Sequence, residues 1–181
     1  MDQAQLLSRL QLVFQEHGYE GATLSKLAAH SGLGKASLYH HFPGGKAEIG
    51  ATLLSGAIER LEKLAFAALR QNANPRQRLT EFVDGFATYT EDGASPCLIA
   101  AFSQGSAWVA HGDAVAEQFQ SWRALLAATF QEAGYKPRRA RREADALLGV
   151  LYGQLLLAKL SDDPGAFRRS IKRLKKSLLA G

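Results

Sequence analysis

Residues 23–46 read TLSKLAAHSGLGKASLYHHFPGGK, and this stretch predicts two short helices joined by a tight turn. Thr23 is a suitable N-cap for the first helix, because its hydroxyl can accept a hydrogen bond from an unpaired backbone amide. The SGLG segment favours a helix end, since glycine adopts the left-handed backbone conformation without a steric cost. The second helix, residues 35–41, buries Leu38 and keeps a polar outer face, and the PGG segment behind it ends the helix.

Two helices across such a turn are typical of a DNA-binding helix-turn-helix, whose second helix enters the major groove. The polar face of residues 35–41 suits this role. Lysine and histidine can contact phosphates or guanine acceptors, serine can contact a base or the backbone, and tyrosine offers a ring and a hydroxyl. A helical hairpin inside another all-α protein, with its polar face in solvent, would give the same pattern. The residues of the hairpin leave both interpretations open.

The first quarter of the chain resembles the N-terminal domain of TetR-family transcriptional regulators. The matching residues are Phe14, Gly18, Thr23, Leu27, Ala28, Gly32, Lys35, the segment 38–42 (LYHHF) and Lys46. A double glycine, Gly44 and Gly45, precedes Lys46 where many relatives have one residue. This detail resembles the LmrA/YxaF-like branch of the family.

The resemblance implies a homodimeric transcriptional regulator, a repressor released by a small-molecule effector. Each second helix would read one half of an inverted repeat in double-stranded DNA. The expected DNA-binding residues are Lys35, Ser37, Tyr39 and His40 for recognition, and Thr23, Lys26 and Lys46 for phosphate contacts. The family pattern has a phosphate-contacting lysine at the position of Lys46, whereas Lys26 would also fit a solvated lysine.

The composition sets further limits. The chain has 181 residues, 46% of them hydrophobic, which is enough for a real core. A single cysteine, Cys97, excludes a disulfide framework and suits a reducing cytoplasm. The beginning, MDQAQLLSRL, lacks the basic and apolar segments of a signal peptide, so we expect a cytoplasmic protein.

The net charge of +5 is a weak argument for DNA binding. Residues 136–181 hold twelve basic and four acidic side chains, so the excess of positive charge lies at the C-terminal end of the chain. Residues 1–47, the expected DNA-reading part, hold four basic and three acidic side chains. The DNA-binding interpretation therefore depends on the motif.

Helical periodicity continues along the chain, and no alternating strand pattern, internal repeat or low-complexity segment is found. We expect helices at about 4–17, 46–72, 76–91, 97–109, 114–133, 144–158 and 164–179, with a turn at His111-Gly112-Asp113. The predicted fold is all-α. A three-helix helix-turn-helix domain at residues 1–47 is joined by a long helix to a helical effector-binding and dimerisation domain at residues 48–181.

The expected helix 144–158 is apolar nearly all round, so it must be covered on every side. It is too short to span a bilayer, which takes about 20 apolar residues. Together with the amphipathic last helix it predicts half of a four-helix bundle that a second subunit completes, as in TetR-like dimers. The expected interface residues are Leu148, Gly149, Leu151, Tyr152, Gly153, Leu155, Leu156, Phe167, Ile171, Leu174 and Leu178.

The last helix also carries six cations off its apolar stripe. They indicate a solvated face or, alternatively, contact with a membrane or nucleic acid. The narrow apolar stripe suits packing against protein better than insertion into lipid, so we expect no membrane partner.

Aromatic residues beyond residue 47 fit either plain core or an apolar cavity between helices. The family favours a cavity, because its members bind small effectors in this domain, and the ligand would be a small apolar or aromatic molecule. The expected lining residues are Phe66, Phe86, Tyr89, Phe102, Trp108, Phe119, Trp122 and Tyr152.

No catalytic or metal site is expected. His40 and His41 are adjacent and cannot share a metal in the usual i, i+4 manner, and no P-loop, dinucleotide fingerprint or nucleophile elbow is found. Cys97 has no evident base partner. We therefore expect no enzyme activity and no cofactor. The alternative function is a helical ligand-binding or scaffolding dimer that lacks specific DNA binding.

Overall fold

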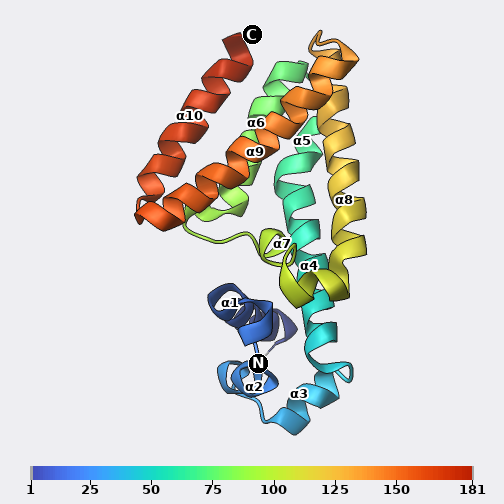
Figure 1. The fold of residues 1–181 in the computed structure, drawn as a ribbon, viewed down its shortest axis with the longest axis vertical. Helices are drawn as coiled ribbons and strands as arrows, with labels where there is room; N and C mark the ends of the chain where they lie inside the picture. Colours follow the sequence, from blue (N-terminus) through green and yellow to red (C-terminus); the bar gives the residue numbers. More distant parts are fainter. Residues whose placement is uncertain (1, 181) are drawn as a thin grey trace. The chain divides into compact units, whose positions relative to one another are not determined.

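The computed structural model describes residues 2–180, and all its regular elements in that range are helical (Figure 1). The elements are α1 Gln3–Gly21, α2 Leu24–Ser31, α3 Lys35–His41, α4 Gly45–Leu61, the π-helical η1 Glu62–Phe66, α5 Ala67–Leu69, α6 Pro75–Tyr89, the 3-10 helix η2 Glu91–Gly93, α7 Leu98–Ala101, α8 Gly105–Glu132, α9 Pro137–Ser161 and α10 Pro164–Ala180. The predicted all-α fold is confirmed.

The described residues form two compact units. Unit 1 holds residues 2–58 and 97–116, and unit 2 holds residues 59–96 and 117–180. Helices α4 and α8 therefore contribute residues to both. This division follows packing, and it groups α7 and the first turns of α8 with the helix-turn-helix. A domain boundary after residue 47 stays a prediction.

The local structure of the helix-turn-helix follows from its sequence. Gly18 adopts a φ of +66°, which turns the chain near the end of α1. Thr23 caps α2, because its Oγ1 accepts a hydrogen bond from the Lys26 amide at 3.3 Å. Gly32 ends α2 in the left-handed region at a φ of +75°. The predicted limits of α3 are those observed.

Four rings form the centre of unit 1. Phe14 and Tyr19 of α1 contact Phe102, with ring centroids 5.6 and 5.3 Å apart, and His111 of α8 lies 5.6 Å from Tyr19. Gly50 of α4 lies under this cluster, and a β-carbon there would come within 3.1 to 3.2 Å of three of the four rings. Burial lowers the pKa of His111, and its Nε2 atom is buried without a hydrogen-bond partner among the described residues. Burial therefore favours the neutral form of this imidazole, which packs against the aromatic rings.

The prediction of a turn at His111-Gly112-Asp113 was wrong, because these residues lie within α8. The chain breaks earlier, between α7 and α8, where Gly105 has a φ of +60°. Gly112 remains helical and makes room for the Trp108 indole, since a β-carbon would lie 2.7 Å from Trp108 Cδ2. Glycine costs a helix only about 1 kcal/mol, so a close packing contact can override it.

In unit 2, Glu62 joins η1 to α8. Its carboxylate accepts hydrogen bonds from Trp122 Nε1 at 2.5 Å, Gln118 Nε2 at 3.1 Å and Arg70 Nη1 at 2.7 Å. The Phe66 ring stacks on the Trp122 indole, with centroids 4.6 Å apart and planes 8° from parallel. The expected single helix 46–72 is therefore interrupted by a π-helical segment, which is a common site of irregularity in long helices.

Helix α9 is longer than the sequence indicated, and it begins at Pro137, a favoured first helical residue. The expectation of a helix too short to cross a bilayer was therefore wrong, because α9 is long and apolar enough to do so by length and composition alone. A third of its most apolar 18-residue window is buried within this chain. Helix α10 lies alongside α6 and α9 (Figure 1).

The contact between α6 and η1 gives a testable prediction. A β-carbon on Gly85 of α6 would lie 1.9 Å from the Leu64 carbonyl oxygen, which is backbone and cannot swing away. We expect Gly85→Ala to lower the free energy of unfolding by about 2–4 kcal/mol, measured by urea denaturation. Gly56→Ala is the matched control, because nothing lies within 4 Å of that position and it should stabilise α4 by about 0.5–1 kcal/mol. Equal stability of the two variants would contradict the close approach.

Candidate DNA-reading surface

Helix α3 holds the four predicted recognition residues on its outer surface. Leu38 is buried and anchors the helix, whereas Lys35, Ser37, Tyr39 and His40 are all exposed. One seven-residue helix therefore presents an ammonium group, a hydroxyl, a phenol and an imidazole to solvent. These groups match the donors and acceptors that base edges and phosphates offer.

The turn before α3 is held by polar contacts that the sequence analysis missed. The Ser31 hydroxyl donates to the Ala28 carbonyl at 2.9 Å and accepts from the Leu33 amide at 3.2 Å. The Arg9 guanidinium of α1 donates to the Ser31 carbonyl at 3.4 Å. Ser31 was treated only as a helix-end residue. Its burial appears only once α1 packs over the turn.

The second glycine of the Gly44-Gly45 pair is favoured by its backbone conformation and by a close side chain. Gly45 adopts a φ of +62°, and a β-carbon there would lie 3.4 Å from Cε1 of Tyr39. The Tyr39 ring therefore lies against the first turn of α4. The Gly44 amide donates to a carboxylate oxygen of Glu48 at 2.6 Å, which caps the same helix.

Two of the three expected phosphate contacts are exposed, and the third is half-buried. Thr23 and Lys26 lie exposed at the start of α2. The Lys46 ammonium lies over the Tyr19 ring, 4.4 Å from its centroid, and 3.5 Å from the Glu20 carbonyl oxygen. Lys46 therefore also packs α4 against the end of α1, and its phosphate contact stays a prediction.

Glu20 fastens the end of α1 to the start of α8. Its carboxylate accepts a hydrogen bond from the Ser106 amide at 2.6 Å, and Gly105 leaves it room. This backbone hydrogen bond is the main cause that lowers the pKa of Glu20. A carboxylate at a helix N-terminus is also favoured by the helix dipole.

The expected aromatic pocket residues fall into two groups. Phe102 and Trp108 belong to unit 1, where Phe102 packs in the four-ring cluster and Trp108 is 44% exposed. The other six belong to unit 2. They are Phe66, Phe86, Tyr89, Phe119, Trp122 and Tyr152. Phe66 and Trp122 stack face to face, and Phe86 meets Tyr152 edge to face at 5.3 Å, so these rings pack directly on one another. Which of them contact a ligand stays a prediction.

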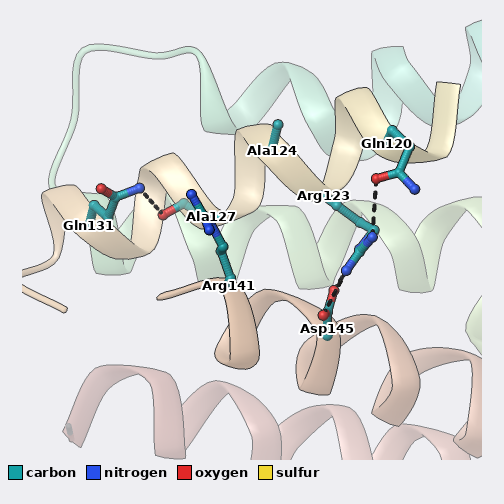
Figure 2. A pocket seen from close by; sticks show the side chains of 7 residues that line it. All are labelled: Gln120, Arg123, Ala124, Ala127, Gln131, Arg141 and Asp145. Carbon is teal, nitrogen blue, oxygen red and sulfur yellow. Dashed lines mark hydrogen bonds and ion pairs between the residues drawn. The ribbon is translucent and has the colours of Figure 1, made fainter. Parts of the chain in front are cut away.

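A polar pocket lies between α8 and α9 (Figure 2). Its cavity is about 340 Å³, and the Arg123–Asp145 ion pair, 2.6 Å between Nε and Oδ1, lies in its wall. The Arg141 side chain reaches across toward Ala127 (Figure 2). This pocket contains none of the aromatic residues expected to line an effector site. Among residues 2–180, no three histidine, cysteine or acidic side chains come close enough to hold a metal ion.

The expected dimer residues divide by exposure. Leu148, Leu151, Leu155, Phe167 and Ile171 are buried within this one chain, and a role for them at an interface stays a prediction. Tyr152, Gly153, Leu174 and Leu178 are half-buried, and Gly149 and Leu156 are exposed. Because α9 is apolar nearly all round between residues 144 and 158, its sequence does not distinguish the inner face from the outer one.

The outer face of α9 is an exposed apolar stripe. Its members recur at helical spacing on one side, and four of them, Ala146, Val150, Leu157 and Leu160, were not among the expected interface residues. The stripe consists of the exposed residues Ala146, Gly149, Val150, Leu156, Leu157 and Leu160, together with the half-buried Gly153. A stripe of this kind, with glycines that allow close approach, is typical of interaction surfaces.

An exposed recognition helix held by a capped turn, attached to a helical second unit, defines a helix-turn-helix DNA-binding regulator. Residues 12–50 match the sequence profile of bacterial regulatory proteins of the tetR family, and residues 75–173 match the C-terminal domain of LmrA/YxaF-like transcriptional regulators. The chain therefore belongs to the TetR family, in its LmrA/YxaF-like branch, and it is a DNA-binding transcriptional regulator.

Known proteins agree with this assignment. The chain is similar to the HTH-type transcriptional regulator LmrA of Bacillus subtilis, with 25% identity over 158 residues that cover 84% of each chain. Its fold matches a TetR transcriptional regulator from Legionella pneumophila, with a TM-score of 0.79, 18% identity and coverage of 98% and 97% of the two chains. It also matches AibR in complex with isovaleryl coenzyme A and operator DNA, with a TM-score of 0.66, 21% identity and coverage of 83% and 84%.

The Glu20 contact predicts a pH effect on stability. Because the pKa of Glu20 is lowered on folding, the contact stabilises the protein above the unfolded carboxyl pKa, about 4.3. This contribution is lost as the pH falls through the lower, folded pKa. We expect Glu20→Gln to be less stable than wild type at pH 7 and to lose less stability on acidification, measured by urea denaturation from pH 7 to 3. Glu117→Gln, an exposed carboxylate later in α8, is the control and should follow wild type.

Proposed function

We propose that this protein is a homodimeric repressor that binds an inverted-repeat operator and is released by a small apolar or aromatic effector. The observation that carries the proposal is the exposed polar face of α3, with Lys35, Ser37, Tyr39 and His40 held outward by the buried Leu38. In the proposed complex these four residues read bases. Thr23, Lys26 and Lys46 contact phosphates and set the register.

The exposed stripe of α9 supports the homodimer. Leu156, Leu157 and Leu160 are each more than half exposed in the single chain, which is costly for leucine side chains on one surface. A second copy related by a two-fold axis would cover the stripe with the same stripe. The two α3 helices would then face two half-sites at a fixed spacing.

The effector belongs to unit 2 in this proposal, within a domain that spans residues 48–181. The structural neighbour AibR is described in complex with isovaleryl coenzyme A and operator DNA, which supports an organic ligand for a protein of this fold. The Phe66–Trp122 stack and its Glu62 link to η1 are the contacts that such a ligand would disturb. Release then requires different effector affinities for the DNA-bound and free conformations.

The proposal places the protein in the cytoplasm, without enzyme activity, cofactor or membrane partner. The alternative is a ligand-binding or scaffolding dimer without specific DNA binding. The near-neutral charge of residues 1–47 favours that alternative. Selection from random duplex DNA distinguishes the proposed repressor from this alternative.

We expect selection from random duplex DNA at about 150 mM salt to enrich a pseudo-palindrome. Lys35→Ala should weaken binding to the enriched sequence by about 1–3 kcal/mol and relax base preference in each half-site. Lys26→Ala should weaken binding to all sequences alike. It should also reduce the slope of the logarithm of the binding constant against the logarithm of the salt concentration by about 0.9, the value for one phosphate contact. Both are measured by fluorescence anisotropy against salt, with Lys159→Ala of α9 as a control that keeps wild-type binding. Folded, dimeric protein that enriches no sequence would favour the alternative function.

The dimer gives a second prediction. A lysine in the middle of the α9 stripe would bury a charge at the interface, so we expect Leu157→Lys to shift the protein from dimer to monomer in analytical ultracentrifugation. Val109→Lys is the matched control. Val109 is 87% exposed but lies on α8, outside the stripe. A dimer that survives Leu157→Lys and dissociates with Val109→Lys would place the interface elsewhere.

A further inference from the structure

The six cations of α10 fall into two sets of three. In the first set each side chain has a polar partner at 2.5 to 3.0 Å. These pairs are Arg169 with Asp163, Arg173 with Ser170, and Lys175 with Asp84. Three of the six cations of α10 are therefore paired with polar groups of the same chain.

The second set is Arg168, Lys172 and Lys176. All three are exposed, and within residues 2–180 their side chains make no hydrogen bond or ion pair. They are spaced four residues apart, so they form one straight row along the helix. Like charges at this spacing repel each other and destabilise a helix. The row keeps a positive potential that a bound anion would neutralise.

The same three cations border a groove between α10 and α6. The groove has a cavity of about 470 Å³, within the range of small-molecule sites. Ile171 and Leu179 of α10 and Ala87 of α6 give it an apolar floor. Asp84, which pairs with Lys175, and Asp92 are the two acidic side chains in the lining, against four basic ones. The groove therefore combines an apolar floor with an excess of positive charge.

We propose that this groove binds a single-chain anionic amphiphile, with a carboxylate or phosphate head among Arg168, Lys172 and Lys176 and a hydrocarbon chain along Ile171 and Leu179. An inorganic anion would leave the apolar floor of the groove exposed to water. A neutral hydrocarbon would leave the three cations without a counter-charge. Only a ligand with both parts matches both features. The binding is separate from DNA reading and does not depend on it.

The ligand is a free amphiphile and not a lipid within a bilayer. Membrane-bound helices insert an apolar face into the headgroup region. On α10, Phe167 is fully buried, and Ile171 is only 8% exposed at the bottom of the groove, so neither side chain can insert into a headgroup region. The face that carries the row offers Leu179 as its one large exposed apolar residue among those described.

The test uses dodecanoate and dodecyl phosphate below their micelle concentrations, titrated into the full-length protein by isothermal titration calorimetry. We expect one ligand per chain, weaker at high salt because the head contacts are exposed. Dodecanol and inorganic phosphate should each bind at least tenfold more weakly, since each lacks one part of the ligand. Absence of dodecanoate and dodecyl phosphate binding to wild type would overturn the proposal.

The variant that tests the row is Arg168→Gln/Lys172→Gln/Lys176→Gln, which should bind both amphiphiles at least tenfold more weakly. Its matched control removes the same charge from α9, as Arg138→Gln/Arg142→Gln/Lys159→Gln, and should bind as wild type. Thr88→Trp changes no charge but fills the groove from the exposed side of α6. It should also abolish binding. Circular dichroism checks that each variant is folded.

Three results would overturn the proposal. The row variant could bind as tightly as wild type, which would place the ligand elsewhere. The protein could bind vesicles of anionic phospholipid but neither free amphiphile, which would assign the row to a membrane surface. The row variant could become monomeric in ultracentrifugation, which would assign the row to the subunit interface. The DNA selection described above is a separate measurement, so failure here leaves the DNA-binding function standing.

Discussion

The helix-turn-helix depends on the burial of aromatic side chains in the second half of α1. Helices α2 and α3 have eight and seven residues, fewer than the roughly 12–15 that an isolated helix needs in water. They persist because Leu27 and Leu38 are buried in unit 1. The Phe14 and Tyr19 rings fix α1 against Phe102 and His111, so the short helices are held by a packed cluster and not by their own hydrogen bonds.

Polar contacts also join these helices to one another. The Glu20 carboxylate binds the Ser106 amide at the start of α8, and Lys46 covers the Tyr19 ring from α4. In unit 2, Glu62 binds Trp122 and Gln118 of the same α8. Helix α8 is continuous from Gly105 to Glu132, so one helix carries both attachments. Residues of α8 therefore take part in the packing of each unit.

Some features were readable from the sequence because their causes are local. Thr23, Gly32 and the PGG segment set the limits of α2 and α3 through caps and backbone preferences within a few residues, and the structure agrees. The break before α8 was misplaced because Gly112 looked like a turn residue. Its glycine serves a packing contact with Trp108 that no local pattern reveals. Arg9 and Ser31 were missed for the same reason, since their contact joins α1 to the turn across 22 residues.

The sequence by itself determined the all-α class, the helix-turn-helix, and the polar face of α3, because periodicity, capping and glycine conformation act between neighbours. Only the tertiary structure decided which side of α9 is core and which is an exposed stripe, since a helix apolar on all sides has no amphipathic signal. It also decided which cations of α10 are paired. In the sequence, Arg169 and Lys175 cannot be distinguished from Arg168 and Lys172. In the structure, Arg169 and Lys175 are paired because folding brings the carboxylates of Asp163 and Asp84 close to them.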